Sequence, residues 1–281
     1  MDAAKPLTLA FSPCPNDTYI FAALANRWLD GAAPEVRVHV TDIADLNNAA
    51  LKGGYELTKV SYGAVPLLLD RYRILRAGGA LGRNCGPLIV RRKGGPKDLD
   101  ALEGLVVAVP GERTTAFMLL RLAMQARPQT LQMRFDRIIA AVAEGVVEAG
   151  LIIHESRFVY EEAGLECIAD LGEWWESQTG MPLPLGAVLI SNDLGDARAK
   201  EFNAAIRESL RYAREHDRQI MAYVREHATD MREDVMRKHI KLYVNEFTED
   251  LGAAGESAVR ELFARAHAAG VIPDFPKPTF V

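Results

Sequence analysis

The chain is poor in cysteine and has no long apolar run, and both absences limit what the protein can be. Only three cysteines, Cys14, Cys85 and Cys167, occur among 281 residues, and no two of them have the CxxC spacing. Neither a disulfide framework nor a cysteine-bound zinc site is expected, so a reducing compartment fits best. No apolar run approaches the ~20 residues of a membrane-spanning helix, and the first residues lack the features of a secretory signal. We therefore expect a soluble, cytoplasmic protein.

A strong excess of one charge is also absent. Lys and Arg number 33 and Asp and Glu 38, for a net charge of -5, and the basic residues are spread along the chain. A nucleic-acid-binding protein usually shows a basic surface, so we expect no nucleic-acid partner and no membrane partner. The hydrophobic content of 49% is typical of a globular protein. We expect a small molecule as the partner, and the sequence leaves a homodimer open.

Short apolar strands alternate with helices along the chain, which predicts an α/β fold. Asn16 or Asp17 is expected to cap the first helix, and the Gly-rich segment 77–87, which contains no Walker A pattern, is expected to be a loop. The predicted strands are 7–11, 36–40, 57–60, 88–90, 105–109, 151–153, 165–168 and 187–190. The predicted helices are 18–28, 45–51, 64–69, 98–102, 116–125, 136–148 and several after residue 196.

Breaks in this pattern predict two crossings between lobes, near 88–92 and 186–191. Residues 1–90 and 190–281 would form one discontinuous α/β lobe, and residues 91–189 an inserted α/β lobe. Two lobes that are joined by two crossings predict a hinged clamshell with the ligand between them.

His154 is the candidate catalytic residue. It follows the apolar run 151–153, at the carboxyl end of a predicted parallel strand, where open α/β sheets bind ligands. Histidine suits general-base chemistry near neutral pH; a buried histidine satisfied by backbone groups is the alternative. Glu155 should point the other way. His154 has no partner at the HExxH spacing and no histidine cluster is present, so no metal site is expected.

Two further turns carry candidate binding residues. Lys59 and Ser61 share one face of a predicted strand, so they could contact an anionic ligand group together; a surface lysine beside a turn serine is the alternative. Thr114, Thr115 and Ala116 open a helix whose free N–H groups suit a carboxylate or a sugar hydroxyl, although a simple helix cap would look the same.

Cys14 lies in a proline-flanked loop beside the predicted cleft. A nucleophilic cysteine needs an activating base, and no such base can be identified from the sequence. A small packed side chain is therefore the preferred interpretation.

Five motifs in this order resemble those of the 1,4-dihydroxy-6-naphthoate synthases, which act in the futalosine route of menaquinone biosynthesis. The motifs are SPCPNDT at 12–18, LTKVSY at 57–62, VPG and TTA at 109–111 and 114–116, GLIIHE at 150–155, and PLPLG at 182–186. The resemblance extends over essentially the whole chain. It implies a type II periplasmic-binding-protein-like fold of two lobes, in agreement with the predicted clamshell.

The resemblance also implies a reaction and its residues. The family is a carbon-carbon lyase that converts cyclic dehypoxanthinylfutalosine into 1,4-dihydroxy-6-naphthoate, with no metal or organic cofactor. Its base matches His154. Its substrate contacts match Lys59, Val60, Ser61, Thr115 and Ala116, and we add the neighbouring Thr114 and Asn16 as candidate contacts. Fold does not settle function, so a solute-binding protein of the same fold and the sibling chorismate dehydratase remain alternatives.

Overall fold

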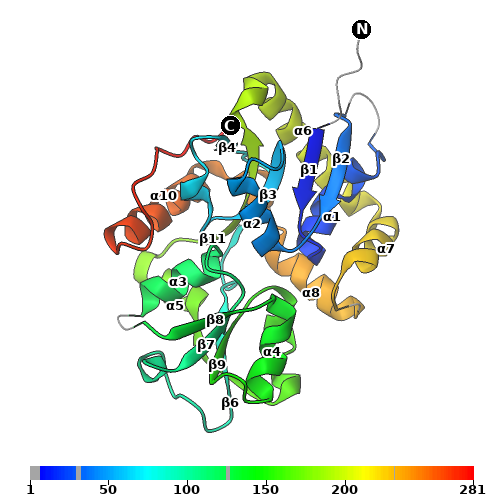
Figure 1. The fold of residues 1–281 in the computed structure, drawn as a ribbon. Helices are drawn as coiled ribbons and strands as arrows, with labels where there is room; N and C mark the ends of the chain where they lie inside the picture. The colour runs from blue at the N-terminus through cyan, green and yellow to red at the C-terminus, as the bar shows by residue number, and fades with distance from the viewer. Residues whose placement is uncertain (1–6, 30–32, 125–126, 231) are drawn as a thin grey trace.

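Two β-sheets organise the computed structural model, which describes residues 7–29, 33–124, 127–230 and 232–281 (Figure 1). The first sheet has the strand order β2-β1-β3-β11-β4, and β5 also pairs with β11; the second has the order β10-β6-β9-β7-β8. The strands of the first sheet are β1 (Leu7–Phe11), β2 (Val36–Val40), β3 (Leu57–Ser61), β4 (Tyr72–Ile74), β5 (Ala80–Gly82) and β11 (Leu183–Ser191). Those of the second are β6 (Leu88–Arg92), β7 (Val106–Val109), β8 (Gln129–Gln132), β9 (Ala149–Ile152) and β10 (Leu165–Asp170).

Each sheet carries its own helices and so forms its own lobe, as Figure 1 shows. Within the first lobe, α1 packs against α6, α7 and α8, and in the second lobe α4 packs against β9. The helices of the first lobe are α1 (Pro15–Ala25), α2 (Ile43–Leu51), α6 (Gly195–Glu215), α7 (Asp217–His227), α8 (Glu233–Tyr243), α9 (Glu246–Glu249) and α10 (Gly252–Ala268). Those of the second are α3 (Thr115–Ala123), α4 (Phe135–Ala143) and α5 (Leu171–Thr179). Short 3₁₀ helices cover Val65–Leu67, Asp100–Leu102, His154–Phe158, Tyr160–Ala163 and Asn192–Leu194.

Parallel pairing sets which strand ends meet. β1 is parallel to β2 and β3, and β7 is parallel to β8 and β9. Because the carboxyl ends of parallel strands lie at one edge of a sheet, the turns after β1 and β3 lie together, as do those after β7 and β9. The predicted two-lobed α/β fold is confirmed.

The crossings between the lobes lie a few residues from the predicted positions. β6 pairs with β9 and β10 over its length, so it belongs wholly to the second sheet. β11 pairs with β3, β4 and β5, so it belongs wholly to the first. The predicted boundaries, 90/91 and 189/190, would each cut a strand whose ladder hydrogen bonds all go to one sheet. The chain instead crosses within 83–87 and 180–182.

Several helix bounds also differ from the prediction. The first helix begins at Pro15 rather than Thr18, with Cys14 as its N-cap, because the fixed φ of proline suits the first helical position. Asn16 and Asp17 thus lie in the first turn and do not cap the helix. The helix expected over 136–148 ends at Ala143, before Gly145 at φ +78°. The expected helix 116–125 runs to Ala123, and residue 125 lies outside the described residues.

Other short elements were also predicted differently. Most of the Gly-rich segment 77–87 is a loop, but Ala80–Gly82 pairs with β11 and forms β5. The helices expected at 64–69 and 98–102 are single 3₁₀ turns, Val65–Leu67 and Asp100–Leu102. Such turns and three-residue strands are fixed by tertiary pairing, so hydrophobic periodicity cannot show them.

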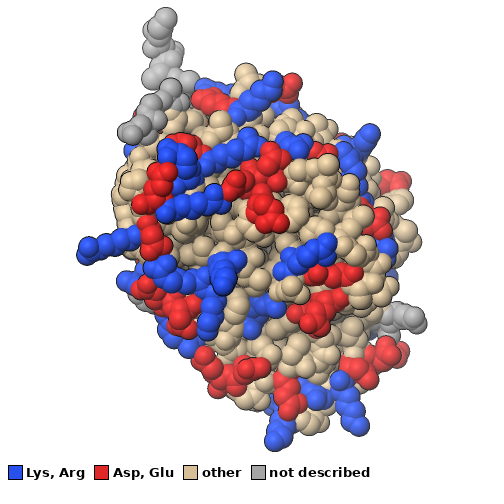
Figure 2. Space-filling model, turned by 180° about the vertical axis from the view of Figure 1, so that it is seen from behind, with Lys and Arg blue, Asp and Glu red and all other residues tan. Residues whose placement is uncertain are grey.

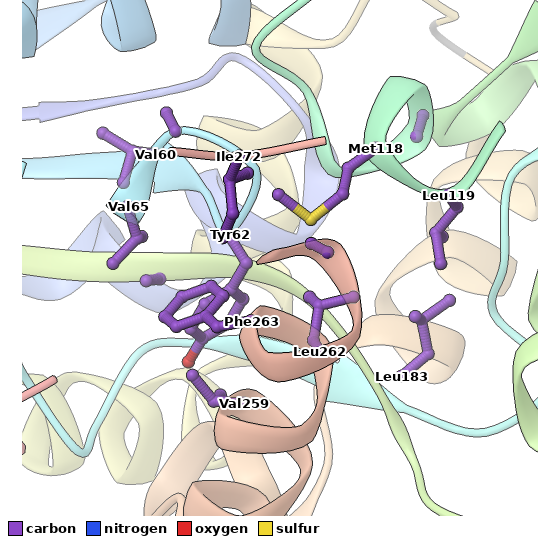
Figure 3. Close-up of a cluster of buried hydrophobic side chains, with 14 of the residues drawn as sticks. Val60, Tyr62, Val65, Met118, Leu119, Leu183, Val259, Leu262, Phe263 and Ile272 are labelled. Carbon is purple, nitrogen blue, oxygen red and sulfur yellow. The ribbon is translucent and has the colours of Figure 1, made fainter. Parts of the chain in front are cut away.

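A shared apolar core joins the lobes at one side, as Figure 3 shows. α3 of the second lobe packs against α10 and β11 of the first. Met118 and Leu119 of α3 are buried in the same cluster as Leu262 and Phe263 of α10. The Tyr62 ring, just after β3, lies 6.3 Å from the Phe263 ring. Apolar packing is therefore continuous from one lobe to the other.

The exposed surface carries both kinds of charge. Figure 2 shows basic and acidic side chains interleaved over one face of the molecule. The pairs on helix α6, such as Arg211 with Glu208 and Glu215, are exposed, and such pairs contribute little to stability. Among the described residues, no helix has the length and apolar character needed to cross a membrane.

Candidate active site

The turns after β1, β3 and β9 and the start of α3 meet in one cleft between the two sheets. All of the predicted site residues except Val60 line this cleft; the Val60 side chain is buried in the apolar cluster of Figure 3. The polar residues that line the cleft are Ser12, Asn16, Asp17, Lys59, Ser61, Thr114, Thr115, His154, His239 and Tyr243.

His154 lines the cleft, and one of its two ring nitrogens has no hydrogen-bond partner among the described residues. Its backbone has φ +58°, a conformation that costs energy for a residue other than glycine and often marks a functional site. Nδ1 lies 3.3 Å from the Sγ atom of Cys14, and the Phe135 ring packs edge-on at 4.9 Å. Nε2 is buried and has no hydrogen-bond partner among the described residues. Burial lowers the pKa of His154 to about 4, aided by Lys59 and opposed by Asp17. The imidazole is therefore neutral near pH 7 and can accept a proton.

Lys59 is paired inside the protein. Its Nζ atom lies 2.8 Å from Asp17 Oδ1 and donates to the Gly78 carbonyl oxygen at 2.7 Å. Both side chains of the pair are almost fully buried. Sequence reasoning assigned Lys59 to an anionic ligand and missed Asp17. In the structure the charge of Lys59 is balanced by the Asp17 carboxylate, which also lines the cleft, and its contact with a ligand stays a prediction.

Ser61 lines the cleft, and among the described residues its hydroxyl group donates to no acceptor. The Asn47 side chain donates from Nδ2 to Ser61 Oγ at 3.0 Å and accepts from the Ser61 N–H at 2.8 Å. Because Ser61 Oγ already accepts from Asn47, its own O–H remains available to donate to a ligand. Sequence reasoning missed Asn47, which is fully buried in α2.

The start of α3 offers backbone donors rather than hydroxyls. Thr114 is the N-cap: its Oγ1 accepts from the Phe117 N–H at 3.1 Å and donates to the Gly111 carbonyl oxygen at 2.7 Å. Thr115 Oγ1 donates to the Leu185 carbonyl oxygen at 2.7 Å and accepts from the Gly63 N–H at 3.1 Å. Both hydroxyls are thus used within the protein. The N–H groups of Thr115 and Ala116, at the first two helical positions, have no intrahelical partner and suit an anionic or hydroxyl group.

A second histidine faces the same cleft, and sequence reasoning missed it. His239 Nε2 lies 2.9 Å from Asn16 Oδ1, and Asn16 Nδ2 donates to Asp17 Oδ1 at 2.9 Å. Because the amide nitrogen of Asn16 faces Asp17, its oxygen accepts from His239 Nε2–H. The ring of His239 lies 6.3 Å from that of His154. The sequence contains one signal that could have identified His239. It is a polar residue on the buried face of an amphipathic helix, one turn after Val235 and Met236.

Glu155 lies with His154 in the 3₁₀ helix His154–Phe158 rather than in a strand, and it approaches His239 from the second lobe. Its Oε2 lies 3.9 Å from His239 Nδ1, and neither atom has a hydrogen-bond partner in the described part of the chain. Burial raises the pKa of Glu155 to about 7 and lowers that of His239 well below its usual value. Near neutral pH the pair therefore places a carboxyl group that is only partly ionised beside a bare imidazole nitrogen. Across the described ranges, no group of three or more His, Cys, Asp or Glu side chains is arranged to hold a metal ion.

Comparison with known proteins identifies the family of this chain. Residues 7–268 match a family model described as "Menaquinone biosynthesis". The 1,4-dihydroxy-6-naphthoate synthase of Thermus thermophilus is 50% identical over 99% of this chain and 100% of its own length. That of Streptomyces coelicolor is 45% identical over 96% of both chains. The Candida albicans CA3427 product, described as exhibiting the generic periplasmic binding protein fold, superimposes with a TM-score of 0.70 at 14% identity, over 97% of this chain and 92% of its own. The resemblance seen in the motifs is thereby confirmed, and the chain belongs to the menaquinone biosynthesis family that includes the 1,4-dihydroxy-6-naphthoate synthases.

Proposed function

We propose that this protein is a lyase that converts cyclic dehypoxanthinylfutalosine into 1,4-dihydroxy-6-naphthoate, with His154 as the general base and without a cofactor. The names of the two relatives support the reaction. One observation carries the catalytic role: His154 Nε2 has no partner in the described residues and belongs to a ring that lines the cleft. A neutral, unpartnered imidazole nitrogen is what proton abstraction requires.

The other residues would bind and orient the substrate. Ser61 donates its free O–H to a polar group of the ligand, and the N–H groups at Thr115 and Ala116 bind a second. Because these donors come from both lobes, the ligand is fixed relative to His154 only when the lobes are together. The base then removes a proton and starts an elimination that ends in aromatisation, while the enclosed cleft excludes water.

The test is to mix the purified protein with cyclic dehypoxanthinylfutalosine and to follow the naphthoate by absorbance and mass. Wild-type protein should form product, and His154→Gln should fold normally and form none. The matched control is His216→Gln, an exposed histidine of the first lobe, which should turn over like the wild type. Full turnover by His154→Gln would refute the assigned base.

Two other functions are outcomes of the same experiment. Tight binding without product would indicate a solute-binding protein of this fold, and turnover of chorismate instead would indicate the sibling dehydratase. The neutral base in the cleft favours chemistry over binding alone. We also propose a cytoplasmic location, on the low cysteine content, and a small molecule rather than a nucleic acid as the partner. A homodimer remains a prediction.

A further inference from the structure

Two buried polar atoms face each other between the lobes, where α8 meets the 3₁₀ helix His154–Phe158. Glu155 Oε2 of the second lobe lies 3.9 Å from His239 Nδ1 of the first, and neither atom has a hydrogen-bond partner in the described part of the chain. Glu155 is 5% exposed and His239 is 1% exposed. A buried polar atom without a partner is costly, so the state of this pair affects how firmly the lobes stay together.

The hydrogen bonds behind His239 determine what its Nδ1 atom can do. Asp17 forms an ion pair with Lys59, and a carboxylate can only accept hydrogen bonds. The amide nitrogen of Asn16 donates to Asp17 Oδ1 at 2.9 Å, so the amide oxygen faces His239 Nε2, also at 2.9 Å. Nε2 therefore carries a hydrogen. Burial lowers the pKa of His239 well below its usual value, so the ring is neutral near pH 7 and Nδ1 has only a lone pair.

One proton decides whether this contact attracts or repels. A protonated Glu155 can donate its O–H to the Nδ1 lone pair of His239, and the same proton can instead move to Nδ1 and leave an ion pair. An ionised Glu155 beside the neutral ring sets lone pair against lone pair in a buried site. In either attractive form, shortening the present 3.9 Å to about 2.8 Å completes a hydrogen bond between the lobes.

The neighbouring charges add to this sensitivity. Asp136 of α4 and Asp230, just before α8, lie near Glu155. Arg134 and Arg232 pair with these two carboxylates. Burial, together with the two carboxylates and against the backbone N–H of the residue itself, raises the pKa of Glu155 to about 7. The other titratable or charged side chains around the pair are Cys14 of α1, His154 and Arg157 of the 3₁₀ helix, and Tyr243 of α8.

We propose that Glu155 and His239 form a proton-dependent latch between the lobes, which one shared proton holds closed and which opens when Glu155 ionises. This inference goes beyond the proposed reaction, because it concerns the opening of the fold and involves no substrate. The shared apolar core holds the lobes together at α3 and α10. At the α8 edge the lobes are also joined by the exposed Arg232–Glu162 ion pair, which contributes little to stability. The latch therefore acts on the edge that is less firmly held.

The size of the effect follows from the proton that the latch holds. When the lobes are apart, Glu155 is in water and has its ordinary pKa of 4.5, whereas in the structure its pKa is about 7. Closing therefore takes up a proton between these two pH values. The ratio of closed to open molecules is highest below pH 4.5 and falls as the pH rises through 7. Between pH 6 and pH 8 the fall should be about 10-fold.

Spin labels across this edge test the latch in the free protein. The labels are attached to Glu161→Cys and Lys238→Cys, two exposed positions, in a Cys167→Ser background, and pulsed EPR gives the distance between them. The wild-type pair should gain a population at longer distance between pH 6 and pH 8. Glu155→Gln cannot ionise and can donate to Nδ1, so it should keep the short distance at both pH values. Glu162→Gln, which removes an exposed carboxylate from the same edge, is the control and should keep the wild-type pH dependence.

One further variant separates the shared proton from the simple burial of Glu155. His239→Phe keeps a flat ring and removes the acceptor, so at pH 6 it should lower the ratio of closed to open molecules about 5-fold, the effect of one hydrogen bond. An unchanged ratio would refute the role of His239. Wild-type distances that are the same at pH 6 and pH 8 would overturn the proposal without any variant. Because no substrate is present, a protein that shows the expected distances but forms no naphthoate would retain the latch and refute the proposed reaction.

Discussion

Replacing Glu155 by glutamine should stabilise the protein above neutral pH and have almost no effect at low pH. Glu155 is 5% exposed, and burial raises its pKa from 4.5 to about 7. Between these two values the unfolded chain has released the proton and the folded protein has kept it. Stability therefore falls as the pH rises, because the folded state binds more protons. Below pH 4.5 both states are protonated and the effect vanishes.

The size of the effect follows from the same two values. The interval from 4.5 to about 7, at about 1.4 kcal/mol per pH unit, gives about 3 kcal/mol of lost stability above pH 7. Glutamine cannot ionise, so Glu155→Gln avoids this loss. Its amide can also donate to the bare Nδ1 of His239, which lies 3.9 Å from the present carboxyl oxygen.

Urea unfolding at several pH values between 4.5 and 8 measures the difference directly. The stability of Glu155→Gln relative to the wild type should grow from near zero at pH 4.5 to about 3 kcal/mol at pH 8. The control is Glu173→Gln, an exposed carboxylate on α5, which should differ by less than about 0.5 kcal/mol throughout. A difference that is constant or shrinks with rising pH would refute the reasoning, because it would mean that Glu155 is ionised in the fold.

Three further predictions concern the same cleft. Because the pKa of His154 is lowered to about 4 and the neutral ring is the base, kcat/KM should persist well below pH 6.5 and fall only as the pH approaches 4; an acid limb near 6.5 in the pH–rate profile would contradict this. Lys59→Met or Asp17→Asn alone should cost about 3–5 kcal/mol in urea unfolding, and the double variant should cost much less than their sum; simple additivity would show that the buried pair is not coupled. Gly63→Ala should lower stability by about 1–3 kcal/mol, because a Cβ there would lie 2.6 Å from the Thr114 carbonyl oxygen; an unchanged Tm would contradict so close an approach.

The sequence predicted those parts of the cleft that depend on neighbouring residues. The apolar run that ends before His154 marks a strand end, and Lys59 and Ser61 are two apart in one strand. Thr114 caps a helix, as the residue order indicates. Such features follow from periodicity and capping, which act over a few residues.

Contacts between side chains that lie far apart in the sequence could not be predicted. Cys14 and His154 are 140 positions apart, and His239 reaches Asn16 from 223 positions away. No local pattern encodes these contacts, because they depend on how the lobes and α8 pack. Lys59 looked like a free cation for the same reason, since its partner Asp17 lies on another element.

The apolar core shared by the lobes determines where a ligand can enter. Separating α3 from α10 would bring Met118 and Leu119 into water, at roughly 1.5–3 kcal/mol for each side chain. The two side chains together cost at least about 3 kcal/mol. A conformation in which α3 is separated from α10 would therefore be populated by fewer than about one molecule in a hundred. On the other edge, where α8 faces the 3₁₀ helix His154–Phe158, the unpartnered atoms of Glu155 and His239 oppose each other, and the exposed Arg232–Glu162 ion pair between the lobes contributes little to stability. The lobes should therefore separate along the His239 edge only. Substrate would enter and product would leave past His239, directly beside the proposed base His154.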